Sequence, residues 1–278
     1  MEKLGLIAGS GRFPVLVAQE AKRAGVEVVA FGFPGVTDAP ALEAVVGKVE
    51  YYKLGQLDKP IQAMKAAGVT KAVMAGKVQH VSVFGGIMPD LRAAKILARL
   101  ADKRTDTILK AVADEFAKDG IELQSSVAYL GAMLVGEGVQ TKRKLDAAEL
   151  ADARLGWKAA KALAGFDVGQ TVVCKDGAVI ALEGMEGTDA CVRRAHDLAA
   201  SHGKKVALTL VKVAKPKQDL RFDIPVLGLE SLKVFAEAGV TALALEANTT
   251  LIFDKPEFLK AADAQRLAIA GYKPEGPA

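Results

Sequence analysis

Short β-branched runs alternate with amphipathic segments in the first third of this 278-residue chain, and that alternation constrains the fold more than any other feature. We expect strands at Lys3 to Ala8 and Val26 to Phe31, with a helix at Arg12 to Ala24 between them. Strands that are joined one after another by covering helices form parallel sheets. The chain is therefore predicted to begin with a Rossmann-like, nucleotide-binding type of α/β domain.

The same alternation continues along the chain. The next expected elements are a strand within Ala44 to Leu54, a helix at Leu57 to Ala67, a strand at Ala72 to Ala75, helices at Leu91 to Ala101 and Thr105 to Lys118, and a strand at Ile121 to Ser125.

A domain boundary is expected near residue 136, because Leu134 to Lys144 loses apolar periodicity and gathers glycine and charge. We predict two α/β domains, 1–136 with a mostly parallel sheet and 137–278 with a mixed sheet. Asp146 is expected to cap a helix and Asp176-Gly177 to turn a β-hairpin. The elements expected in the second domain are helices at Asp146 to Ala164, Thr188 to Ala200, Leu229 to Ala238 and Pro256 to Ala270, and strands at Thr171 to Cys174, Ala178 to Leu182, Lys205 to Val213, Ala242 to Leu245 and Thr250 to Phe253.

Composition narrows the function classes. Hydrophobic residues make up 51% of the chain, but no run approaches the roughly 20 apolar residues that span a bilayer. We expect a cytoplasmic protein, because no signal-peptide pattern opens the chain and two cysteines suit a reducing compartment. The formal charge of +4 is compatible with a phosphorylated substrate or an anionic membrane surface. Nucleic acid is not expected as a partner, because the basic residues are dispersed and aromatic RNA-binding signatures are missing.

Three glycine-bearing loops could hold a phosphate group. Gly9-Ser10-Gly11-Arg12 follows the first strand and opens a helix, where N–H groups and the helix dipole receive anions. Gly76-Lys77 follows a central strand, a common ligand position in open α/β sheets. Gly187-Thr188-Asp189 leads into a helix that Thr188 could cap. Taken alone, a plain turn explains the second loop equally well, and a plain cap explains the third better.

An NAD site is disfavoured at the first loop. Pro14 stands where the dinucleotide pattern has its third glycine, and the second predicted strand ends without an acidic residue to bind a ribose hydroxyl. Elsewhere, His80, His196 and His202 form no local metal motif, so surface or packing roles are expected for them.

The most informative segment runs from Ala214 to Pro225. It concentrates cations for a polyphosphate beside acidic groups that could hold Mg²⁺ or orient water, the combination that phosphoanhydride hydrolysis requires. A solvated turn with an internal pair between Arg221 and an aspartate explains the same residues. Spacing alone leaves both interpretations open.

The order of these motifs resembles that of the LpxI-type UDP-2,3-diacylglucosamine pyrophosphatases, nearly from end to end. Each motif is short, and the specificity of the resemblance comes from their order and spacing. One departure is Arg104-Thr105-Asp106, where members often have Gly-Asp-Asp, so a role for Asp106 is left open. The matching segments are Leu6 to Pro14, Ala75 to Val78, Pro89-Asp90, Glu186 to Asp189, Lys215 through Gln218, Arg221, Asp223, Pro225 and Gly228.

The resemblance implies a Mg²⁺-dependent hydrolase of lipid A biosynthesis that cuts UDP-2,3-diacylglucosamine into UMP and 2,3-diacylglucosamine 1-phosphate (lipid X). Asp223 falls on the family's catalytic aspartate, which would position Mg²⁺ or the attacking water. The substrate-binding residues expected from the matched motifs are Gly9, Ser10, Gly11, Arg12, Gly76, Lys77, Gly187, Thr188, Asp189, Lys215, Gln218 and Arg221.

Several expectations accompany this assignment. The active site should lie between the domains, with the first domain chiefly binding the nucleotide. A lipid substrate would bring the enzyme into transient contact with the cytoplasmic membrane leaflet. The apolar run Val127 to Val135 could help to receive acyl chains, although core packing explains it better. A homodimer is left open. The alternative to an enzyme is a non-catalytic UDP-sugar-binding or regulatory protein that retains the glycine loops.

Overall fold

The chain forms two compact units in a computed structural model that describes residues 2–78, 89–100, 105–201, 206–215, 219–222 and 224–277. The first unit comprises Met1–Leu130 together with Asp219–Asp223, and the second comprises Gly131–Gln218 together with Ile224–Ala278. Both units are α/β, which confirms the predicted fold class. The return of a short segment from the second half of the chain to the first unit was not expected.

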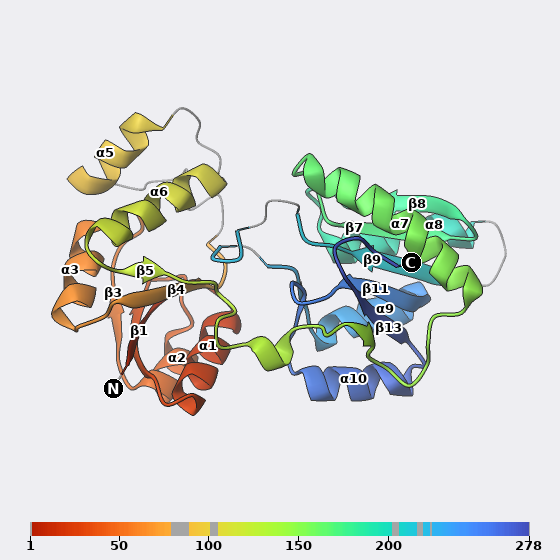
Figure 1. Cartoon of the computed structure of the whole chain (residues 1–278), viewed down its shortest axis with the longest axis horizontal. Helices are drawn as coiled ribbons and strands as arrows, with labels where there is room; N and C mark the ends of the chain where they lie inside the picture. Colours follow the sequence, from red (N-terminus) through yellow and green to blue (C-terminus); the bar gives the residue numbers. More distant parts are fainter. Residues whose placement is uncertain are drawn as a thin grey trace. The chain divides into compact units, whose positions relative to one another are not determined.

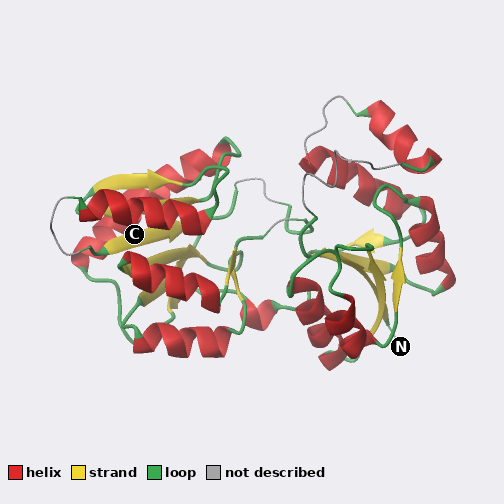
Figure 2. Ribbon diagram, turned by 180° about the vertical axis from the view of Figure 1, so that it is seen from behind, coloured by secondary structure: helices red, strands yellow, loops and turns green. Residues whose placement is uncertain are grey.

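The first unit is built on a parallel sheet with strand order β3-β2-β1-β4-β5, as the Rossmann-like prediction requires (Figure 1). The helices α1 and α2 cover one face of the sheet, and α3 and α6 pack on the other (Figures 1 and 2). The elements are β1 (Lys3–Ala8), α1 (Phe13–Arg23), β2 (Glu27–Gly32), α2 (Ala39–Val46), β3 (Val49–Tyr51), α3 (Asp58–Ala66), β4 (Lys71–Ala75), α5 (Leu91–Arg99), α6 (Thr105–Lys118) and β5 (Glu122–Leu123).

Most expected elements of this unit are present, but α2 was missed. The Asp38 carboxylate accepts a hydrogen bond from Ala41 N at 3.5 Å, and Pro40 occupies the first turn. A capping aspartate followed by proline is a local helix start signal. The run of small apolar residues after it was instead assigned in part to the region of the following strand.

The second unit has a mixed sheet with strand order β6-β13-β11-β9-β7-β8, as predicted. The strands β9, β11 and β13 are parallel, and β6, β7 and β8 each pair antiparallel with a neighbour. A separate pair of short parallel strands, β10 and β12, lies outside this sheet. The elements are β6 (Gly138–Val139), α7 (Ala147–Gly165), β7 (Thr171–Lys175), β8 (Ala178–Leu182), α8 (Thr188–Ala200), β9 (Leu208–Lys212), β10 (Val226–Leu227), α9 (Leu229–Ala238), β11 (Val240–Glu246), β12 (Leu251–Ile252), α10 (Lys255–Ala264) and β13 (Ala268–Tyr272), preceded by a 3₁₀ turn at Gly131–Met133.

Two local predictions for this unit are confirmed. Asp146 caps α7 in a full capping box, because its carboxylate accepts from Glu149 N at 2.9 Å while Glu149 accepts from Asp146 N at 3.0 Å. Asp176 and Gly177 both have positive φ, at 50° and 78°, as a two-residue hairpin turn of type I′ requires.

The expected helix from Pro256 to Ala270 is wrong in its second half. α10 ends at Ala264, Arg266 adopts a left-handed φ of 57°, and Ala268–Tyr272 forms β13 inside the sheet. Alanine-rich composition favours helix locally, but pairing with β11 and burial of the strand override that preference.

The two faces of the second sheet carry separate cores. α7 packs on one face, where Gly156 lets the helix approach closely, since a Cβ there would lie 2.7 Å from Val211 Cγ2. α8, α9 and α10 contribute to the larger core on the other face. Cys174 and Cys191 are buried. Among the described residues, no helix is both long and apolar enough to cross a membrane.

Candidate functional site

The first two glycine loops lie against each other at the carboxyl ends of β1 and β4, where the strand order of the first sheet reverses. Gly9 N donates to Ala75 O at 2.7 Å. Ser10 and Lys77 then exchange two backbone hydrogen bonds, of 2.8 and 3.1 Å. This switch point is the usual ligand position in a doubly wound sheet. The structure thus brings together two motifs that are 67 residues apart.

Close backbone approach is the reason for two of the glycines. A Cβ at Gly9 would lie 2.7 Å from Lys77 O, and a Cβ at Gly76 would lie 2.6 Å from Ser10 O. Gly76 also has a φ of 91°, in the region that disfavours side chains. The Ser10 hydroxyl donates to Lys77 O at 2.8 Å, so it holds the loops together. Gly9 and Gly76 therefore shape this site through close backbone approach, and Ser10 shapes it through its hydroxyl as well.

The same loops present an open polar surface. Gly11, Arg12 and Lys77 are exposed, and a Cβ at Gly11 would meet nothing within 4 Å. Arg12 is the N-cap residue of α1, with no side-chain cap. An exposed helix start with two cationic side chains can bind a phosphate group. In the loop after β2, Thr37 Oγ1 donates to the carbonyl of Ala8, the last residue of β1, at 2.6 Å, a link that sequence reasoning missed.

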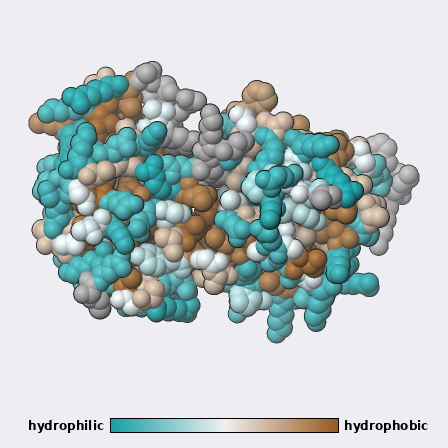
Figure 3. Space-filling model, viewed as in Figure 1, coloured by the Kyte–Doolittle hydropathy of each residue, from teal (hydrophilic) through white to brown (hydrophobic). Residues whose placement is uncertain are grey.

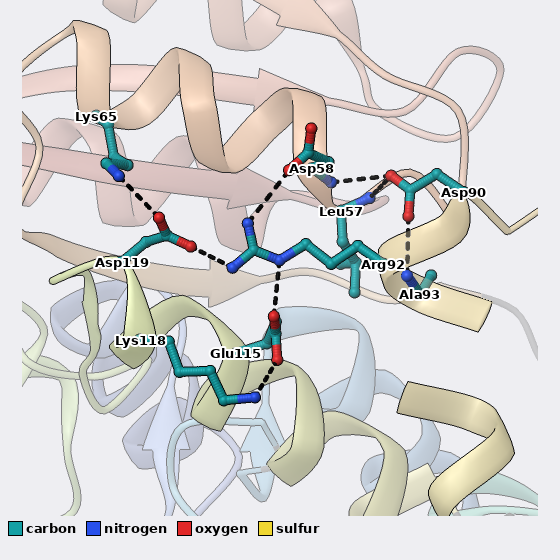
Figure 4. A network of polar contacts seen from close by, with 9 residues as sticks. All are labelled: Leu57, Asp58, Lys65, Asp90, Arg92, Ala93, Glu115, Lys118 and Asp119. Atoms are coloured by element: carbon teal, nitrogen blue, oxygen red, sulfur yellow. Dashed lines mark hydrogen bonds and ion pairs between the residues drawn. The ribbon is translucent and has the colours of Figure 1, made fainter. Parts of the chain in front are cut away.

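A polar network holds α5 against α3 and α6 (Figure 4). The Asp90 carboxylate accepts from Ala93 N at 2.8 Å and from Leu57 N at 2.8 Å, so it caps α5 and α3 together. Burial alone would raise the pKa of Asp90, but these N–H donors hold it below its ordinary value. Pro89-Asp90 was one of the matched motifs, and its aspartate caps two helices in this structure.

Arg92 occupies the centre of the same network. Its guanidinium pairs with Glu115 at 2.7 Å, with Asp58 at 3.3 Å and with Asp119 (Figure 4). Lys65 also reaches Asp119 at 2.8 Å, and hydrogen bonds from Lys65 and Arg92 lower the pKa of the Asp119 carboxyl. These pairs join α5 to α3 and α6.

The third loop lies in the second unit, beside a buried lysine that sequence reasoning missed. Lys212 Nζ donates to Thr188 Oγ1 at 2.8 Å and to Thr171 Oγ1 at 3.0 Å, and it lies 3.9 Å from the Glu183 carboxylate. The Lys212 and Glu183 side chains are only 6% and 10% exposed. The available signal was a lysine ending the buried strand Leu208–Lys212.

Glu183 remains charged in this cluster. Burial alone would raise its pKa, but the Lys212 charge and hydrogen bonds from Thr171, Thr188 and Gln170 N lower the pKa below its ordinary value. A buried charge that is paired and hydrogen-bonded can stay ionised.

The cap predicted for Thr188 is wrong. Gly187 is the N-cap of α8, with no side-chain cap, and Thr188 is the first helical residue. The Thr188 hydroxyl donates to Glu183 Oε1 at 2.9 Å. Its partners are Glu183, just after β8, Thr171 of β7 and Lys212 of β9, and the two strand partners are too distant in the sequence for a local pattern to indicate. Gly187 has a φ of 83°, and Asp189 is exposed in the first turn.

Lys215 follows β9, and the backbone of the residue before it is hydrogen-bonded to the buried Glu246 carboxylate. Glu246 Oε2 accepts from Ala214 N at 2.8 Å and from Lys161 Nζ at 2.6 Å, and the Glu246 side chain is 4% exposed. Lys215 itself pairs with Asp167 at 2.5 Å near the surface.

Arg221 belongs to the first unit and pairs within its own turn. Two of its nitrogens contact the Asp219 carboxylate, at 2.6 and 2.9 Å. Leu220 O accepts from the Ser126 N and Oγ atoms, each at 2.9 Å, and Phe222 packs on the core of that unit. This is the internal arginine–aspartate turn that the sequence left open.

Several expectations lie outside the described residues, namely those for Gln218, Asp223, His80 and His202 and for the Asp106 side chain. His196 has the expected packing role, with Nδ1 3.0 Å from Ala238 O. In the described part of the chain, no three or more His, Cys, Asp or Glu side chains gather as a metal site would require. Asp223, the metal ligand that the resemblance implies, lies outside that part.

Val127, Leu130 and Val135 are buried, at 8%, 1% and 0% exposure. Core packing therefore accounts for these three residues of the apolar run Val127 to Val135, and its other residues are partly or fully exposed.

Comparison with known proteins assigns the chain to a family. The model of the LpxI N-terminal domain matches residues 3–133, and that of the LpxI C-terminal domain matches residues 136–270. The chain is 32% identical over 281 aligned positions to the UDP-2,3-diacylglucosamine pyrophosphatase LpxI of Caulobacter vibrioides, with 99% of each chain covered. On both grounds, this chain belongs to the LpxI family.

Proposed function

We propose that this protein hydrolyses the pyrophosphate bond of UDP-2,3-diacylglucosamine, releasing UMP and 2,3-diacylglucosamine 1-phosphate, as a step of lipid A biosynthesis. The observation that carries the proposal is similarity along 99% of the chain to a relative named for pyrophosphatase activity on this substrate. The two facing glycine loops of the first unit support it, because they offer backbone and cationic groups to a nucleotide phosphate.

Each unit would bind one part of the substrate. Gly9 to Arg12 and Gly76-Lys77 suit the UDP phosphates, since exposed Gly11, Arg12 and Lys77 lie at the switch point of a nucleotide-type sheet. Gly187 to Asp189 and Lys215 suit the sugar-phosphate part of the lipid. Lys212 supports that role, because its buried ammonium holds the Thr188 hydroxyl beside the N-terminus of α8.

The chemical step in this proposal is direct attack by water on phosphorus, without a covalent enzyme intermediate. Asp223, which the resemblance implies is the catalytic aspartate, would orient that water or hold Mg²⁺. When bound, Mg²⁺ supplies offsetting charge for the developing transition state.

An assay of UMP release tests the activity. The purified protein, incubated with UDP-2,3-diacylglucosamine and Mg²⁺, should release UMP, and turnover should stop with EDTA and return when Mg²⁺ is restored. Binding of the substrate without UMP release would favour the non-catalytic UDP-sugar-binding alternative. Repeating the reaction in H₂¹⁸O identifies the attacked phosphorus by the product that carries the label.

The role of Asp223 needs a matched control. Asp223→Ala should retain folding and substrate binding but lose turnover severely. Asp219→Asn changes a carboxylate in the same segment, one that is already paired with Arg221, and should keep most of the turnover. Full turnover in Asp223→Ala would remove this residue from the mechanism, and equal loss in both variants would indicate a fold effect.

We also propose that the protein works in the cytoplasm and visits the inner leaflet of the membrane, because its substrate would carry two acyl chains. Cell fractionation with and without a salt wash distinguishes a peripheral association from its absence. Light scattering of the purified protein determines whether it forms a homodimer.

A further inference from the structure

Large apolar side chains are exposed on two short segments of the second unit. Phe166 and Val168, just after α7, are 81% and 52% exposed, and Leu182 and Met185, at the end of β8 and beyond it, are 44% and fully exposed. Figure 3 shows hydrophobic residues at the edge of this unit, where Figure 1 places the end of α7. Exposed apolar groups that gather in this way commonly mark a binding surface.

The two segments border one hollow. It has a volume of about 580 Å³, within the range of small-molecule sites, and it lies at the end of β8, an edge strand that both α7 and α8 contact. Its lining residues are Leu163, Val168, Leu182, Glu183, Gly184, Glu186, Ala190 and Arg194.

The hollow has an apolar part and a polar corner. Leu163, Val168, Leu182 and Ala190 supply the apolar lining. At the polar corner, the Glu183 carboxylate accepts a hydrogen bond from Thr188 Oγ1 at 2.9 Å. An apolar trough that ends beside polar groups fits an amphiphile, with its chain in the trough and its head group at the corner.

The charges of the hollow are already balanced. Arg194 pairs with Glu186 at 2.7 Å, and Glu183 has Lys212 as its counter-charge at 3.9 Å. A ligand in the hollow therefore needs no charge of its own, which suits a hydrocarbon chain.

We infer that this hollow receives one acyl chain of the lipid substrate. The inference rests on the proposed function, which supplies a substrate with two acyl chains and places Thr188 at its sugar-phosphate part. An anionic bilayer fits this surface less well, because Arg194, the cation among the lining residues, is already paired with Glu186 and does not attract negative lipid head groups as an unpaired cation would.

Binding of the diacylglucosamine 1-phosphate product tests the inference without catalysis. Titrations use versions with short and with longer acyl chains, below the concentration at which they form micelles. In the wild type, each added methylene that enters the hollow should tighten the Kd about fourfold, until the hollow is filled.

Two variants block the hollow by different means, one with a charge and one with bulk. Leu182→Asp places a charge in the trough, and Ala190→Phe fills it with an apolar ring. Both positions are exposed enough to accept a new side chain. Each should weaken binding of the long-chain product at least tenfold while changing the short-chain Kd less than twofold. Leu198→Asp is the matched control, because Leu198 is 50% exposed on α8 and does not line the hollow, and it should leave both Kd values unchanged.

The outcomes separate this inference from the proposed function. UMP release with an unaltered chain-length dependence in Leu182→Asp and Ala190→Phe would overturn the hollow as an acyl site while leaving the enzyme intact. Absence of UMP release at every chain length would instead overturn the activity. Weaker sedimentation of Leu182→Asp with anionic vesicles, with chain-length dependence in solution unchanged, would assign the patch to a membrane contact and overturn the inference.

Discussion

The buried pair of Lys212 and Glu183 makes the sharpest energetic prediction. Lys212→Met removes the cation and leaves a carboxylate whose side chain is 10% exposed. Breaking a buried ion pair from one side typically costs about 3–5 kcal/mol. The lower end of this range is expected here, about 3 kcal/mol, because Thr188 and Gln170 N still donate to Glu183.

Urea unfolding followed by tryptophan fluorescence measures this loss. Trp157 is the only tryptophan in the chain, and it is 3% exposed in α7, so its emission reports on the second unit. With a slope of about 2 kcal/mol per molar urea, the midpoint should fall by about 1.5 M at pH 7.

The loss of stability in Lys212→Met should depend on pH. In the wild type the pKa of Glu183 is lowered, so its contribution to stability is present above the unfolded pKa and is lost as the pH falls through the folded value. Without Lys212, burial should raise the pKa of Glu183 above its ordinary value. The folded variant then binds the proton more tightly than the unfolded chain, so its deficit relative to the wild type should shrink between pH 7 and pH 5.

A double variant and a surface control complete the test. Lys212→Met with Glu183→Gln should be more stable at pH 7 than Lys212→Met alone, because no uncompensated charge remains. Lys233→Met breaks an exposed pair with Glu230 and should cost about 0.5 kcal/mol or less. A deficit that is equal at both pH values, or a double variant no more stable than the single one, would refute the reasoning.

Three further predictions follow from the same structure. Gly76→Ala should destabilise the protein by about 1–3 kcal/mol and weaken UDP binding, because its Cβ would lie 2.6 Å from Ser10 O at a φ of 91°; unchanged thermal denaturation and titration would contradict this. Arg92→Met should speed proteolytic cleavage within α5 by removing three ion pairs, and a wild-type cleavage rate would show that the network does not anchor the helix. Burial raises the pKa of Cys174 to about 12 and that of Cys191 to about 11, so native protein at pH 8 should resist iodoacetamide, as mass spectrometry can check; rapid labelling before unfolding would contradict this.

The sequence predicted best those features that depend on neighbouring residues. The capping box at Asp146 and the hairpin turn at Asp176-Gly177 both form where expected, because each joins groups only a few residues apart. The alternation of strands and helices was also sufficient for the fold class. The family could also be predicted, because the order and spacing of short motifs are read directly from the sequence.

Local patterns failed where distant partners decide the outcome. Ala268–Tyr272 has helical composition but forms a strand, because it pairs with β11 and is largely buried. Thr188 is a residue type that often caps helices, yet its hydroxyl binds Glu183, just after β8, and Lys212 of β9.

The sequence alone thus determined the fold class, the capping box at Asp146 and the hairpin turn at Asp176-Gly177. Only the tertiary structure decided that Gly9 and Gly76 face each other, that Lys212 is buried beneath Thr188, and that Arg221 pairs within a turn on the first unit. The physical reason is that close backbone approach and buried charge pairing are set by strand order and burial. Both arise only when segments many residues apart pack together.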